Sequence, residues 1–180
     1  MKQAEHDMLV IDAQDGSGRA LDALVRHHHR KLLRFAYSLC RDTALAQDAV
    51  QDAWIKVVGR LRSLDDPRAF RGWIYHAVRW RVLDLLKRSH RDDRSLEDVD
   101  AESQSVVGDL ARDRRIDLDA AIAGLAKGDR ETLQLFYVSG LSVPEIAVVL
   151  DIPAGTVKSR LHRARNQLRQ YFEGEDHEYR

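Results

Sequence analysis

Two prolines confine part of the C-terminal half of the chain to a short helix, a turn and a second helix. Ser142 can accept hydrogen bonds from the first turn of the short helix, Pro144 suits that turn, and Glu145 can reach back to complete a capping box. Pro153 disfavours the helical conformation at the residue before it, so the short helix must end near Asp151. Four apolar residues then recur at helical spacing: Val157, Leu161, Ala164 and Leu168.

The second of these helices is strongly basic. From Thr156 to Arg169 it carries five Lys and Arg residues and no Asp or Glu. Two helices joined by a short turn, the second rich in cations, form the helix-turn-helix arrangement, whose second helix enters the DNA major groove. A solvated helix face without a ligand is the alternative. The residues predicted to face duplex DNA are Thr156, Lys158, Ser159, Arg160, His162 and Arg163.

Helical periodicity also runs through the N-terminal half. Apolar residues recur at three- and four-residue steps over 21–39, 46–61 and 73–86. Three prolines and ten glycines in 180 residues favour helices over a turn-rich β fold. The predicted fold is therefore all-α, with two small helical domains joined by a flexible acidic linker, the C-terminal one a helix-turn-helix. The predicted boundaries are 1–90, 91–117 for the linker, 118–172, and 173–180 for an acidic tail.

The net charge of zero hides a segregation of charge along the chain. Residues 1–90 carry 16 basic and 11 acidic residues, and residues 118–172 carry seven and five. The linker carries five basic and nine acidic residues, and the tail one and four. Such alternation is typical of structured units separated by solvated segments, and an acidic segment can compete with nucleic acid for a basic surface.

A second basic surface lies between Arg68 and Arg91, with seven Lys and Arg residues against one acid. Four aromatic residues are interleaved with these cations: Phe70, Trp73, Tyr75 and Trp80. This composition suits single-stranded nucleic acid, because bases stack on rings while cations follow the backbone. Trp73 lies on the apolar stripe and is predicted to be core. Trp80 lies off the stripe, where it either stacks on a base or covers the neighbouring helix.

Catalysis and membrane insertion find no support in the sequence. The longest apolar run has five residues, the start of the chain is polar, and the single cysteine excludes an internal disulfide, so a cytoplasmic protein is expected. Asp48 and Asp52 stand one helical turn apart and are read as a solvated face, a metal or acid/base pair, or an acidic dock for a protein partner. His27–His29 diverge on a helix and make a poor ligand set. No enzyme activity, cofactor or metal is predicted.

The segment Gly140–Arg169 resembles the fourth-region helix-turn-helix of bacterial extracytoplasmic-function sigma factors, and by itself it also resembles response-regulator output domains. Asp48–Val57 resembles the second-region helix that docks on the polymerase clamp. Phe70–Tyr75, followed by Asp84–Arg88, resembles the segment that opens the strands and reads the minus-ten element. The N-terminal matches therefore favour the sigma-factor family.

This resemblance implies a subunit that binds core RNA polymerase, confers promoter specificity and promotes DNA melting, for a stress or envelope-signal regulon. Its implied partners are core polymerase, promoter DNA as duplex and as melted strand, and an anti-sigma factor. The implied polymerase contacts are Asp48, Gln51, Asp52 and Lys56, with Trp54 as the core anchor of their helix. The implied minus-ten contacts are Arg68, Arg71, Tyr75, His76, Arg79, Trp80, Lys87 and Arg88. The basic helix-turn-helix residues would read the minus-thirty-five element.

The chain departs from the family pattern at two positions. Trp80 stands where the family commonly has Asn, and Asp151 stands at the turn where Gly is usual. Asp tolerates the left-handed conformation better than most residues, so the turn is expected to survive. Two other functions stay open from the residues alone. One is a stand-alone helix-turn-helix repressor or activator with a dimerisation or sensing domain, and the other is a nucleic-acid-processing enzyme, which would need metal-ligating carboxylates.

Overall fold

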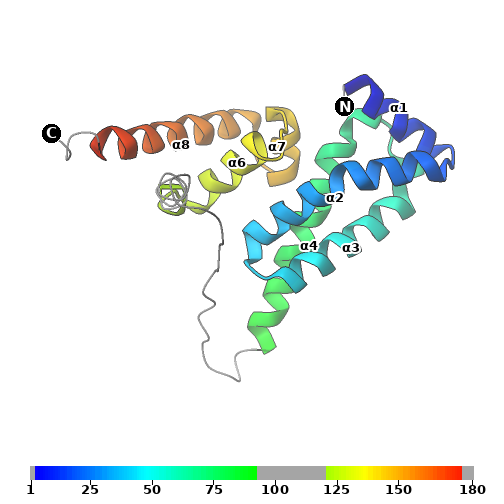
Figure 1. Cartoon of the computed structure of the whole chain (residues 1–180), viewed down its shortest axis with the longest axis horizontal. Helices are drawn as coiled ribbons and strands as arrows, with labels where there is room; N and C mark the ends of the chain where they lie inside the picture. The colour runs from blue at the N-terminus through cyan, green and yellow to red at the C-terminus, as the bar shows by residue number, and fades with distance from the viewer. Residues whose placement is uncertain (1–2, 93–120, 176–180) are drawn as a thin grey trace, which may run out of the picture.

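The computed structural model describes residues 3–92 and 121–175, and its regular elements within these ranges are all helices (Figure 1). The N-terminal domain contains α1 (Gln3–Gln14), α2 (Gly18–Cys40), α3 (Thr43–Arg60) and α4 (Phe70–Asp92). Two short 3₁₀ helices, η1 (Leu61–Ser63) and η2 (Pro67–Ala69), connect α3 to α4. The C-terminal domain contains α6 (Lys127–Tyr137), α7 (Val143–Leu150) and α8 (Ala154–Glu175), and residues 121–123 are also helical. Most of the predicted linker and of the acidic tail lies outside the described residues.

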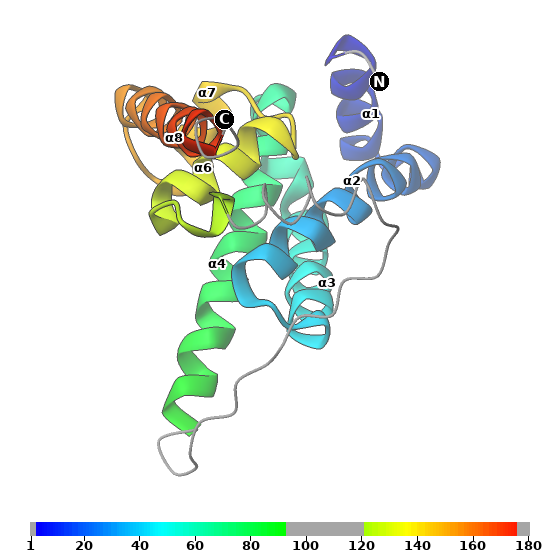
Figure 2. The same cartoon turned by 60° about the vertical axis from the view of Figure 1, so that its left-hand side comes forward.

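The three predicted N-terminal stripes form the core of the first domain. Ser17 caps α2 by accepting a hydrogen bond from the amide of Ala20 at 3.3 Å, and Asp42 caps α3 by accepting one from the amide of Leu45 at 3.0 Å. The long helix α4 packs on both α2 and α3, as Figure 2 shows. Their shared interior contains the buried residues Leu24, Leu32, Phe35, Val50, Ala53, Trp54, Ile74 and Val78. The amphipathic patterns therefore identified these three helices and their inward faces.

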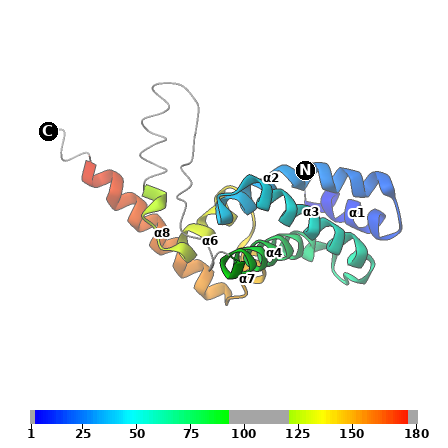
Figure 3. The same cartoon turned by 90° about the horizontal axis from the view of Figure 1, so that it is seen from below.

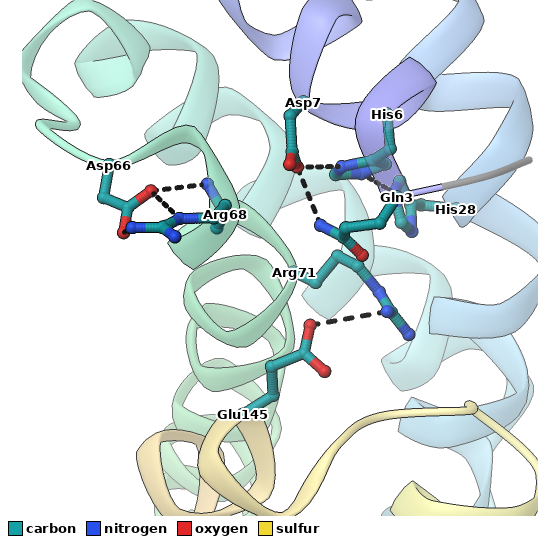
Figure 4. A network of polar contacts seen from close by, with 8 residues as sticks. All are labelled: Gln3, His6, Asp7, His28, Asp66, Arg68, Arg71 and Glu145. Carbon is teal, nitrogen blue, oxygen red and sulfur yellow. Dashed lines mark hydrogen bonds and ion pairs between the residues drawn. The ribbon is translucent and has the colours of Figure 1, made fainter.

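Helix α1 was not predicted, because the first periodic apolar stripe of the sequence begins only at residue 21. Four consecutive apolar residues, 8–11, give α1 no helical period, and only His6 and Val10 are buried. His6 Nε2 lies 2.8 Å from His28 Nε2 of α2 (Figure 4). Phe70 of α4 packs 5.7 Å from both imidazoles, measured between ring centroids. The His6–His28 pair and Val10 hold α1 on the domain, together with the partly buried Leu9 and Ala13 and with two hydrogen bonds from Gln14 Nε2 to the carbonyls of Leu61 and Leu64.

The second domain follows its local signals closely. The Ser142 hydroxyl and the Glu145 carboxylate form the expected capping box at the start of α7. Asp151 ends α7 in the left-handed conformation, with φ 55° and ψ 51°, and α8 begins directly after Pro153. Gly128 lies in the first turn of α6 rather than at the end of a helix. The helix before it had already ended at the turn that follows residue 123.

The two domains pack against each other along α4 and α7 (Figure 3). A Cβ atom built on Gly72 of α4 would lie 3.6 Å from the Cβ of Val148, so the backbone of α4 is close to α7. Ile146 and Val149 of α7 belong to the same buried cluster as the core of the first domain. Helix α8 extends away from the N-terminal helices, which leaves much of its surface open (Figure 1).

Candidate nucleic-acid interface

The outward face of α8 carries polar side chains near its N-terminus. Lys158, Ser159 and His162 are exposed, while Val157 and Leu161 are buried against the rest of the domain. The Ser159 hydroxyl donates to the carbonyl of Thr156 at 2.9 Å. This arrangement is the one in which the second helix of a helix-turn-helix presents side chains to base edges and phosphates.

Two other cations of α8 lean toward α6 instead. Arg163 donates from Nε and Nη2 to the two carboxylate oxygens of Asp129, both at 2.6 Å, and this pairing raises the pKa of the Arg163 guanidinium. Asp129 is 1% exposed, so its carboxylate has exchanged water for this bidentate partner. A Cβ on Gly128 would lie 3.0 Å from the Arg160 guanidinium carbon. The first turn of α6 therefore orients Arg160 and Arg163. No local sequence pattern around Asp129 predicts this positioning role.

Three predicted minus-ten residues of α4 make hydrogen bonds to the C-terminal domain. Arg71 donates from Nη2 to the carbonyl of Gly140 at 2.5 Å and pairs with Glu145 at 3.5 Å (Figure 4). His76 Nδ1 lies 3.2 Å from the carbonyl oxygen of Val148. Arg79 Nε donates to the buried Glu131 carboxylate at 2.6 Å. These donors of α4 are thus occupied by groups of the second domain.

Tyr75 was predicted to contact the minus-ten strand, but the structure places its ring in the core. It is 1% exposed and packs 5.4 Å from the Phe35 ring, centroid to centroid. Burial raises the pKa of its phenol. Position 75 falls on the apolar side of α4, so the interleaving of aromatic and basic residues does not by itself place every member on one face.

The remaining predicted minus-ten residues lie nearer to solvent. Trp80 is 51% exposed, and the Lys56 ammonium lies 4.4 Å from the centroid of its ring, a cation–π contact that links α3 to α4. Arg68 pairs with Asp66 at 3.0 Å, and Lys87 is exposed (Figure 4). Arg88 pairs with Asp84 at 3.1 Å. Trp80 therefore has one face covered by a cation.

The predicted polymerase-docking residues lie on the polar face of α3. Asp48, Gln51 and Lys56 are exposed. Asp52 is half-buried because it accepts a 2.6 Å hydrogen bond from Arg81 of α4. Trp54 is 8% exposed and lies in the core, as expected for an anchor. The acidic character of this face thus comes mainly from Asp48.

Residues 3–92 and 121–175 contain neither a metal-binding cluster nor a membrane-spanning helix. No group of three or more His, Cys, Asp or Glu residues in these ranges could hold a metal ion. None of the helices described there is long and apolar enough to cross a membrane.

Comparison with known families defines the class of protein. Residues 24–92 match the family described as Sigma-70 region 2, and residues 115–168 match the family described as Sigma-70, region 4. A helical domain that matches region 2, followed by a helix-turn-helix domain that matches region 4, defines a transcription-initiation subunit. The chain belongs to the sigma-70 family of RNA polymerase sigma factors, in its extracytoplasmic-function group.

Individual relatives agree with this assignment. The chain is 34% identical over 166 residues to the ECF RNA polymerase sigma factor SigL of Mycobacterium tuberculosis, covering 89% of this chain and 93% of SigL. It is 32% identical over 163 residues to the ECF RNA polymerase sigma factor SigE of Mycolicibacterium smegmatis, covering 84% of this chain and 61% of SigE. The sigma factor RpoE of Bartonella quintana, solved with the anti-sigma factor NepR, superposes with a TM-score of 0.65 at 26% identity, covering 84% of this chain and 96% of RpoE.

The protein is therefore a non-enzymatic polymerase subunit that binds core RNA polymerase and promoter DNA to initiate transcription. From here on, the N-terminal domain is called region 2 and the C-terminal domain region 4.

Proposed function

We propose that this sigma factor binds core polymerase, the minus-thirty-five duplex and the melted minus-ten strand through three different surfaces. The exposed face of α3, with Asp48, Gln51 and Lys56, docks on core polymerase. The N-terminal half of α8 reads the minus-thirty-five duplex through Lys158, Ser159 and His162, together with Thr156, Arg160 and Arg163. The basic side of region 2 takes the melted minus-ten strand with Arg68, Arg71, His76, Arg79, Trp80, Lys87 and Arg88, while Tyr75 supports that side from the core.

The observation that best supports the proposal is the separation of the surfaces. Lys158 and its neighbours lie on α8, which extends away from α3 and α4 (Figure 1). Asp48 lies on α3, in the other domain. A single substitution on one surface is therefore expected to leave the other intact, since distant sites without shared partners behave additively.

The test compares two charge changes in two binding assays. Asp48→Lys should weaken binding to bacterial core polymerase, while Lys158→Ala should leave that affinity unchanged and weaken holoenzyme binding to a duplex selected from a randomised pool. The loss for Lys158→Ala is expected to shrink as salt rises, because phosphate contacts release counterions. Asp12→Lys on the exposed face of α1 and Arg169→Ala further along α8 are the matched controls. Equal loss in both assays for either variant would contradict the assignment of surfaces.

The cellular setting follows from the same proposal. The protein acts in the cytoplasm, where polymerase and promoters are, on a regulon of stress or envelope signals. An anti-sigma factor holds it inactive, as the complex of the Bartonella relative with NepR suggests. Affinity purification of the tagged chain under non-inducing conditions should recover one stoichiometric partner that excludes core polymerase. Co-purification of that partner with polymerase would argue against such a role.

A further inference from the structure

A small cleft lies where the C-terminal end of α2 meets the first turns of α6. Its cavity volume is about 230 Å³, and both regions contribute to its walls. The lining residues with charged or amide side chains are Arg41 at the end of α2, and Lys127, Arg130, Glu131 and Gln134 of α6. None of them belongs to the three surfaces proposed above, so the cleft is a separate feature of the protein.

The cleft gathers three positive charges from the two regions. Within residues 3–92 and 121–175, no ion pair involves Arg41, Lys127 or Arg130. The acidic residue of the lining, Glu131, already accepts a 2.6 Å hydrogen bond from Arg79 of α4. Like charges held close together repel, and the repulsion grows where the walls of a cleft exclude water. An anion between the three cations would relieve it.

Arg41 occupies a backbone position that favours glycine. It ends α2 in the left-handed conformation, with φ 57° and ψ 16°, and its amide donates to the carbonyl of Tyr37 at 2.8 Å. Glycine or asparagine is usual at such a position, because a Cβ atom strains this conformation. A positive charge suits the C-terminal end of a helix, but that benefit does not require a residue at the strained position itself. An anion in the cleft gives the arginine a use there.

The two cations of α6 also lack a structural reason for their position. Lys127 and Arg130 lie within the first four residues of α6, where the helix dipole disfavours positive charge. Arg130 Nη2 donates to the carbonyls of Ala123 and Leu125 at 2.9 and 3.0 Å, which fixes the guanidinium without neutralising its charge. Its Nε is buried and has no hydrogen-bond partner among the described residues. The guanidinium therefore keeps capacity for an anionic acceptor.

Phosphate chemistry matches this set of donors. Guanidinium groups bind phosphate oxygens through paired hydrogen bonds, and a lysine binds them as a point charge. Gln134, also in the lining, carries an amide that can donate a further hydrogen bond. Sites for drug-sized ligands have volumes of about 300–1,000 Å³, so this smaller cleft suits a phosphate or diphosphate group rather than a whole nucleotide.

We propose that the cleft between α2 and α6 binds a small anion that carries a phosphate or diphosphate group. Arg41 of region 2 and Lys127 and Arg130 of region 4 hold this group together. The anion stabilises the folded chain, as does any ligand that binds only the folded state. Binding requires neither polymerase nor DNA, because all three cations belong to the sigma factor itself.

Calorimetric titration of the full chain with pyrophosphate, at fixed ionic strength, tests the site. We expect one saturable site. Lys127→Ala should lower the affinity at least about tenfold, because a charge-assisted contact with phosphate is lost. Arg41→Gly should do the same without destabilising the ligand-free protein, since glycine accepts the left-handed conformation; urea unfolding in phosphate-free buffer checks this. Arg30→Ala removes an exposed cation earlier on α2 and is the matched control, which should bind like the wild type.

Absence of saturable pyrophosphate binding would overturn the proposal, and so would binding that Lys127→Ala and Arg41→Gly both leave unchanged. ADP should bind no more tightly than pyrophosphate, because the cleft has room for the diphosphate alone. Tighter binding of ADP, or displacement of pyrophosphate by a short DNA duplex at near-physiological salt, would overturn the assignment to a small anion. The titration contains no polymerase and no promoter, so its result is independent of the tests of the proposed function.

Discussion

Acid should destabilise the protein through the buried histidine pair between α1 and α2. His28 is 2% exposed, and burial, followed by the charges of His6, His27, Arg71 and Lys31, lowers its pKa from 6.5 to about 3. Burial also lowers the pKa of His6, although Asp7 opposes that shift. The folded state therefore binds protons on these imidazoles less readily than the unfolded chain, which binds them below about pH 6.5.

This difference in proton binding determines whether the free energy of unfolding rises or falls with pH. Stability is complete above the unfolded pKa and falls as the pH drops below it, because only the unfolded chain takes up the proton. Between about pH 7.5 and about pH 5, His28 alone should lower the free energy of unfolding by about 2 kcal/mol, since each pH unit below the unfolded pKa contributes about 1.4 kcal/mol. His6 adds a further loss in the same direction.

Urea unfolding at several pH values measures this loss directly. His28→Gln keeps a hydrogen-bonding group opposite His6 but cannot take up a proton, so its stability should depend much less on pH. His29→Gln changes an exposed neighbour on the same helix and should retain the full pH dependence. A flat pH profile for the wild-type chain, or an unchanged one for His28→Gln, would refute the reasoning.

Two further predictions concern positions where the chain departs from its family. Trp80→Ala should slow permanganate-detected melting several-fold, since stacking on one base is worth about 1–3 kcal/mol, and leave core polymerase affinity unchanged; normal melting would mean that Trp80 serves only its contact with Lys56. Asp151→Gly should be more stable than Asp151→Ala by about 1 kcal/mol in urea unfolding, because position 151 has a φ of 55° that strains a Cβ; equal stability of the two variants would contradict a strained turn.

The sequence predicted the elements whose signals are local. The cap at Ser142, the left-handed Asp151 and the start of α8 after Pro153 each follow from the stereochemistry of a few neighbouring residues. Helix α1 was not predicted because its apolar residues form no helical stripe and its polar contacts are long-range: His6 meets His28 across 22 residues of sequence, and Gln14 donates to the carbonyls of Leu61 and Leu64.

The predicted site residues divide in the same way, into positions that follow from local sequence signals and positions that depend on how the two domains pack. Exposed positions such as Lys158 follow from the helical period of α8 once its buried face is known. The partners of Arg71 and Arg79 lie 69 and 52 residues away, and no spacing rule connects them. Their occupation by region 4 depends on how two domains pack, which periodicity within either domain does not encode.

The two oxygens of the Glu145 carboxylate have different partners, one within α7 and its cap and one in the other domain. Oε2 accepts from the amide and hydroxyl of Ser142 and so completes the start of α7, while Oε1 faces Arg71 of the other domain. Departure of Arg71 leaves the Oε2 contacts in place. The capping box of α7 therefore does not depend on Arg71, and loss of the Arg71 contact leaves the start of α7 intact. By the same logic, Glu145→Gln would weaken the start of α7 and the interdomain contact together, whereas Arg71→Gln would weaken the contact and leave the capping box intact.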